Sequence, residues 1–152
     1  MSSTTHGTNH DVLAPGMLGA EISNVLVAML HRYTGRGPTR ARTTIANNVV
    51  ICVMGQTLTK GEQMLASDGK EEIVLNGRRA YQDMMKAEAV ASVEELSGRK
   101  VIAFMSTNHI EPDLAVEIFI LDPVADDGRP DFESGADGVI ADGAGARGIA
   151  TP

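Results

Sequence analysis

Arginines gather in one short segment of a chain that is acidic overall. Residues 31–42 read HRYTGRGPTRAR and contain four arginines and no acidic residue. Guanidinium groups and outward-turned backbone amides, which the two glycines allow, bind phosphate, carboxylate or bicarbonate. Arg40 and Arg42 lie two residues apart on an expected strand, so they share a face and can hold one anion between them. The predicted anion-binding residues are Arg36, Gly37, Thr39, Arg40 and Arg42.

The same arginines have a structural alternative. Clustered arginine in folded proteins commonly forms ion-pair networks rather than ligand sites. The acids that could pair with it, at a seam between helix and sheet or between subunits, are Glu71, Glu72, Glu94 and Glu95. The segment is not a Walker-type phosphate loop, because GxxxxGK followed by Ser or Thr occurs nowhere in the chain. Both interpretations stay open at the level of the sequence.

A second polar group, HIEPD at residues 109–113, connects two expected strands, and Glu117 follows closely. Imidazole and carboxylate groups can bind a metal or act as an acid–base pair. The spacing matches no ligand signature, however, and the same residues favour a turn. We therefore expect no metal and no cofactor, with His109 and Asp113 as the residues a metal would use.

Nucleophilic catalysis has little support in the residues. No GxSxG elbow occurs, and Cys52 falls inside an apolar run, where a small buried hydrophobic residue is expected. No catalytic residue is assigned, and a non-enzymatic role is favoured over an enzyme.

Composition narrows the classes of function. The 152 residues fit one domain, and 43% hydrophobic with 22% charged residues is typical of soluble globular proteins. A net charge of −7 and 3% aromatic residues argue against nucleic-acid binding. One cysteine excludes an internal disulfide and a cysteine-built zinc site. Because no export signal or membrane span is evident, a cytoplasmic location is expected.

Hydrophobic periodicity predicts the elements that must position these residues. Amphipathic helices are expected at 17–33 and 70–96, and a capping box at 59–62 begins a short helix between them. Strands are predicted at 40–45, 49–54, 101–105 and 114–121. The order α-β-β-α-α-β-β predicts an α+β fold: a two-layer sandwich in which two hairpins form an antiparallel sheet of about four strands, covered by helices.

The long helix carries an apolar stripe, expected to be widened by Val74, Tyr81 and Met85. The stripe consists of Ile73, Gly77, Ala80, Met84, Ala87 and Ala91. Methionines 29, 84, 85 and 105 are expected to fill gaps in the core. Twenty-seven residues at about 1.5 Å each give a helix of about 40 Å, more than a small domain needs. We therefore expect a homodimer in which this helix contacts a second copy.

Composition also divides the chain into three parts. Residues 1–16 are expected to form a disordered arm and residues 17–121 the folded domain. Residues 122–152 are rich in glycine, and their seven acids against two arginines give a charge of −5. This composition predicts a disordered acidic tail that serves solubility.

Several segments taken together resemble the MpsC-like family, which is named for a sodium-translocating, membrane-potential-generating system of bacteria. The matching stretches are LGAEISNVLVAMLHRY at 18–33, GRGPTRAR at 35–42, LTKGE at 58–62, VEELSGRKV at 93–101 and HIEPDLAVE at 109–117. They cover about two thirds of the chain. Gly61 and the Asn76-Gly77 pair depart from the family pattern, because glycine weakens a helix by about 1 kcal/mol relative to alanine.

The resemblance implies a small cytoplasmic domain without settled catalytic activity, peripheral to the inner face of the membrane. It would act as an accessory or regulatory component beside a membrane ion-transport system. The arginine segment, judged by its own residues, is expected to bind a small anion. The alternative is an enzyme or sensor that acts on a small anionic ligand through the same arginines.

Overall fold

The computed structural model describes residues 13–123. Its elements are α1 (Pro15–Thr34), β1 (Arg40–Ala46), β2 (Val49–Gly55), α2 (Lys60–Ser67), α3 (Glu71–Ser97), β3 (Val101–His109) and β4 (Leu114–Leu121). The predicted order and the α+β class are confirmed. α1 begins two residues inside the predicted arm, because a proline in the first helical turn already has the helical φ. The rest of that arm, and the predicted tail beyond residue 123, lie outside the described residues.

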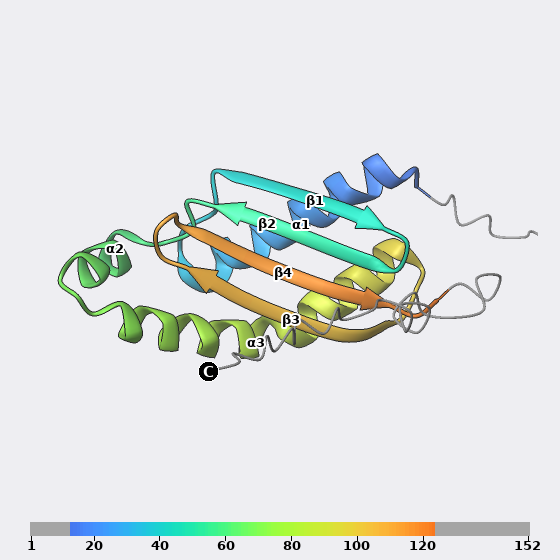
Figure 1. Cartoon of the computed structure of the whole chain (residues 1–152). Coiled ribbons are helices and arrows are strands. Elements are labelled where there is room, and N and C mark those ends of the chain that lie inside the picture. The colour runs from blue at the N-terminus through green and yellow to red at the C-terminus, as the bar shows by residue number, and fades with distance from the viewer. Residues whose placement is uncertain (1–12, 124–152) are drawn as a thin grey trace, which may run out of the picture. The chain divides into compact units, whose positions relative to one another are not determined.

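The four strands form one antiparallel sheet in the order β1-β2-β4-β3. β4 lies beside β2, so the two hairpins meet in the middle and leave β1 and β3 as the edges (Figure 1). Asn47 adopts a positive φ of 52° in the β1–β2 turn, a backbone conformation in which asparagine is enriched. The strand pairing aligns Thr44, Ile51, Ile118 and Met105 in one row across the sheet.

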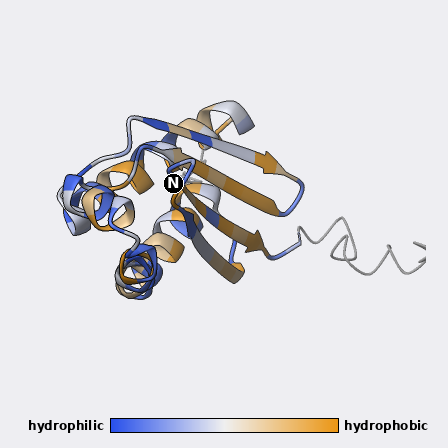
Figure 2. Ribbon diagram, turned by 60° about the vertical axis from the view of Figure 1, so that its left-hand side comes forward, coloured by the Kyte–Doolittle hydropathy of each residue, from blue (hydrophilic) through white to orange (hydrophobic). Residues whose placement is uncertain are grey.

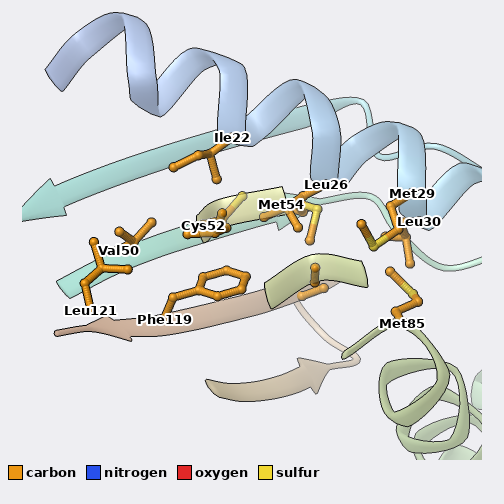
Figure 3. Packing of buried hydrophobic residues seen from close by; sticks show 13 residues of the cluster. Ile22, Leu26, Met29, Leu30, Val50, Cys52, Met54, Met85, Phe119 and Leu121 are labelled. Atoms are coloured by element: carbon orange, nitrogen blue, oxygen red, sulfur yellow. The ribbon is translucent and has the colours of Figure 1, made fainter. Parts of the chain in front are cut away.

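α1 and α3 lie on the same face of the sheet and contact each other (Figure 1). Every second side chain of β2 and β4 points into the layer between helices and sheet, which gives the alternating burial of β4. Figure 3 shows this core closing between α1, α3 and the two central strands. The buried apolar cluster comprises Ile22, Leu26, Met29, Leu30, Val50, Cys52, Met54, Met85, Ala89, Val93, Ala115, Phe119 and Leu121.

The face of α3 that contacts the core differs from the predicted stripe. The residues that α3 buries are Val74, Arg78, Met85, Ala89 and Val93. Ile73 and Met84, which the stripe placed inward, are 56% and 64% exposed. The reason is Arg78: a charged residue in the middle of the true apolar row makes that row look polar in the sequence. Met105 is also exposed, whereas Met29 and Met85 do fill the core as predicted.

Arg78 can be buried because its guanidinium has partners. Nε and Nη2 donate to the two Glu62 carboxylate oxygens at 2.7 and 2.5 Å, and Nη2 also donates to the Thr57 carbonyl at 2.6 Å. Glu62 also closes the predicted capping box of α2 with Thr59, which is confirmed. The pair therefore ties α2 and the segment before it to the middle of α3.

The opposite face of the sheet is covered by no helix of the part of the chain that the structure describes (Figures 1 and 2). We call this the outer face. Its central side chains are aliphatic on three adjacent strands: Val49, Ile51 and Val53 from β2, Val116, Ile118 and Ile120 from β4, and Ala103 and Met105 from β3. β2 and β4 are thus largely apolar on both faces, which is the pattern of strands buried on both sides.

Candidate functional site

The arginine segment runs from the last turn of α1 into β1. Gly35 ends the helix in the left-handed conformation, with a φ of 77°, and its N–H donates to the His31 carbonyl at 2.9 Å. The Thr34 hydroxyl donates to the Leu30 carbonyl at 2.8 Å. At the far end, the Thr39 N–H reaches the Gly55 carbonyl at 3.2 Å, which brings the chain into register with β2. The connection is therefore fixed at both ends.

The structure separates the predicted cluster instead of gathering it. Arg32 pairs with Glu88 on α3, so an ion pair does form, but with none of the four acids proposed from the sequence. Arg36 is half-buried, and its Nε donates to the Gln56 carbonyl at 3.4 Å. It lines a surface hollow of about 430 Å³ that also contains Glu111, whose carboxylate opposes an anion there.

The smaller members of the predicted site have structural contacts. The Thr39 hydroxyl donates to the Gln56 side-chain oxygen. Gly37 lies against His31, because a Cβ at Gly37 would be 3.6 Å from the His31 Cβ. Both residues stabilise the connection between α1 and β1. No described hydrogen bond links either of them to the side chain of Arg40 or Arg42.

Arg40 and Arg42 remain as the two neighbouring cations of the segment. Both are exposed at the β1 edge of the outer face, about 7 Å apart along the strand. Neither side chain makes an ion pair or hydrogen bond with another residue between 13 and 123. The Arg40 side chain passes beside Gly55, where a Cβ would be 3.8 Å from its Nε. Binding of an anion by this pair stays a prediction.

His109 and Asp113 build a turn and the loop after β2. One ring nitrogen of His109, Nδ1, lies 2.9 Å from the Pro112 carbonyl. The Asp113 carboxylate accepts hydrogen bonds from Thr57 N–H and hydroxyl, at 3.0 and 2.9 Å, and from Leu58 N–H at 2.9 Å. Within the described ranges no group of three or more His, Cys, Asp or Glu side chains could hold a metal ion. Glu117 lies on the other face of the sheet from His109.

A buried polar row crosses the helix-facing side of the sheet. The strand pairing places Thr43, Cys52, Glu117 and Ser106 next to one another, one from each strand. α1 adds Ser23, whose hydroxyl lies 2.8 Å from that of Thr43. This row is the feature that the sequence analysis missed. The signal was strand alternation, which groups Glu117 with Ala115 and Phe119 on the buried side.

Glu117 is the unusual member of this row. Its side chain is 6% exposed, and its Oε2 and the Ser106 hydroxyl find no hydrogen-bond partner among the described residues. Burial raises the pKa of Glu117 to about 7, although the neighbouring Ser106 hydroxyl favours the charged form. A cavity of about 10 Å³, lined by Met54, Met85 and Phe104 among others, has room for about one water. The cavity lies beside this carboxyl, since Glu117 is one of its lining residues.

These observations define a small two-layer α+β domain with an exposed pair of arginines and a buried titratable carboxyl. The chain belongs to the family whose model, described as "Na⁺-translocating membrane potential-generating system (MpsC)", matches residues 14–123. The match runs from the start of α1 to the end of β4, so it covers every described element. The resemblance found in the sequence is confirmed.

One curated relative has comparable length. The chain is 25% identical to the uncharacterized protein YrhF of Bacillus subtilis (strain 168) over 116 residues, which are 75% of this chain and 95% of the relative. No solved structure matches the chain. None of the helices described here is both long and apolar enough to cross a membrane.

Proposed function

We propose that this chain is a non-enzymatic accessory or regulatory component of a sodium-translocating, membrane-potential-generating system. The observation that carries the proposal is the family match, which spans the entire described domain. Two exposed features of the domain support it: Arg40 and Arg42, whose side chains have no described partner, and the apolar outer face of the sheet. Such features are typical of recognition surfaces. The domain would act in the cytoplasm, at the inner face of the membrane.

The genetic test is deletion of the gene in the organism that encodes the chain. We expect a reduced sodium-dependent membrane potential, measured with a potential-sensitive dye, and restoration by the full chain. Affinity-tagged chain should recover membrane ion-transport components from detergent extracts. An unchanged potential in the deletion strain, together with no recovered membrane protein, would refute the proposal.

Within this role, the arginine segment would bind a small anionic group through Arg40 and Arg42. Their guanidinium groups are exposed on one face and lack protein partners in the described part of the chain, so they are available to a ligand. Arg36, Gly37 and Thr39 would hold the connection that precedes them. The outer face places both arginines where an anionic group of a partner or of a small ligand can reach them.

An anion panel tests this binding. Phosphate, bicarbonate and short carboxylates should raise the Tm of the wild-type chain, because a ligand that binds only the folded state stabilises it. Replacing both Arg40 and Arg42 by Ala should abolish the shift and leave the Tm without anion nearly unchanged. Arg79→Ala removes an exposed arginine from α3 and serves as the control that keeps the shift. A shift that survives in the double variant would place the anion elsewhere, and turnover of an anion would favour an enzyme.

A further inference from the structure

The outer face has the chemistry of a buried surface. Antiparallel sheets with one solvated face carry polar residues on that face. Here eight aliphatic side chains lie together on β2, β4 and β3, and no strand residue that points to this side is acidic. Val53 is 38% and Met105 50% exposed. Figure 2 shows that strands of the sheet are coloured hydrophobic over much of their length.

The shape and size of this face fit a second copy of the chain. A sheet face of mostly β-branched side chains presents no polar group that a partner must satisfy, so two such faces can pack together and interdigitate about 10 Å apart. Four strands about 4.8 Å apart and about seven residues long give a face of ~440 Å². Two copies would bury about 900 Å² in projection and more with side-chain relief, near the ~1,000 Å² of a biological interface.

Charge selects one arrangement of the two copies. Arg40 and Arg42 occupy the β1 margin, while the outward residues of β3, which are Ala103, Met105, Thr107 and His109, include no arginine or lysine. A two-fold axis across the strands would set β1 against β1 and place all four arginines on one margin of the dimer. An axis along the strands sets β1 against β3 of the second copy and leaves the arginines at the rim, where charged residues are usual.

We propose that the outer face is the interface of a homodimer in which two sheets pack face to face, with β1 of each copy over β3 of the other. This places the contact on the sheet and not on the long helix that the sequence suggested. The inference does not depend on the proposed function. It predicts a four-layer molecule with the helices outside.

The oligomeric state of the full chain tests the interface. By sedimentation velocity, the wild type should run at twice the 16.1 kDa chain mass. Ile118→Asp, at the centre of the face, should run as a monomer. Met105→Arg, on an exposed edge-strand position, should do the same and covers the case in which Ile118→Asp does not fold. Met84→Asp changes an exposed residue of α3 and should stay dimeric.

Three outcomes would overturn the proposal. A wild type that stays at 16.1 kDa at the highest soluble concentration has no such dimer. Dissociation by Met84→Asp and not by Ile118→Asp would assign the contact to α3. A monomeric wild type that sediments with phosphatidylglycerol vesicles through Ile118 would assign the face to a lipid surface.

Crosslinking tests the arrangement. Thr44 and Met105 lie in the same row of the sheet, at its two edges. A mixture of Thr44→Cys and Met105→Cys chains should be joined by a short bismaleimide, whereas Thr44→Cys alone should not. The native Cys52 is fully buried and does not compete. Efficient joining of Thr44→Cys to itself would contradict the proposed axis.

Discussion

Glu117 is a carboxyl surrounded by apolar side chains and hydroxyl groups. Its neighbours across the sheet are Cys52 and Ser106, and no described cation lies in hydrogen-bond contact with it. The charged carboxylate therefore loses hydration without gaining a counter-charge, and its pKa rises to about 7. The folded protein consequently holds a proton there that the unfolded chain has already released.

This proton makes stability depend on pH. The folded pKa of Glu117 is about 7 and the ordinary value is 4.5, so the free energy of unfolding should fall as pH rises between these values and level off above. The loss attributable to Glu117 is about 3 kcal/mol. Glu117→Gln keeps the shape and removes the titration, so urea unfolding from pH 4 to 8 should show the decline in the wild type only. Parallel pH profiles of the two proteins would contradict the assignment.

At the residue scale, the sequence predicted which side chains could carry charge or bind a ligand, but not which residues they contact. The exposure of Arg40 and Arg42 follows from strand alternation, which the sequence contains. The contacts of Arg32 with Glu88 and of Arg36 with Gln56 join residues far apart in the chain, and no local pattern encodes them. Asp113 looked like a metal ligand because its role as acceptor for Thr57 and Leu58 depends on two loops meeting in space.

α3 shows where periodicity misleads at the scale of an element. The apolar residues 73, 77, 80, 84, 87 and 91 recur at helical spacing, yet the buried row passes through Arg78. Hydrophobicity scales rank arginine as a surface residue. Because Arg78 is buried in an ion pair, the sequence pattern assigns the wrong face of α3 to the core. The bounds of the helix were nevertheless predicted within a residue, because the Gly98 that ends it acts locally.

The Arg78–Glu62 pair should be costly to break. Arg78→Met fills the space but removes the counter-charge of the mostly buried Glu62 carboxylate, which keeps only the Thr59 N–H as a donor, and it leaves the Thr57 carbonyl without the Arg78 donor. We therefore expect a loss of about 3–5 kcal/mol. Arg79→Met, at the exposed neighbouring position, should change stability by less than about 0.5 kcal/mol. Chemical denaturation at neutral pH measures both. Combining Arg78→Met with Glu62→Gln should recover part of the loss, and equal effects of the two arginine variants would exclude a structural role for the pair.

For the whole molecule, the sequence predicted the two hairpins and the helix layer but not the strand order. Alternation and turn residues act over a few positions, whereas placing β4 beside β2 requires contacts between distant segments. The continuous apolar sequence of β2, VVICVM, is typical of a strand that is apolar on both sides. In the structure, one apolar side of β2 contacts the helices and the other side belongs to the uncovered outer face.

The position of the only thiol gives this molecule an internal reporter of opening. Cys52 is completely shielded between α1 and the sheet, and burial, helped by the charge of Glu117, raises the pKa of its thiol. A chromogenic disulfide reagent should therefore modify the native chain only as fast as the core opens, at a rate that rises with denaturant. Met84→Cys, at an exposed position of α3 outside the proposed interface, should react at once and sets the reference rate. Immediate modification of the native chain would contradict this prediction. It would mean that the layer between helices and sheet opens often enough to expose Cys52 without denaturant.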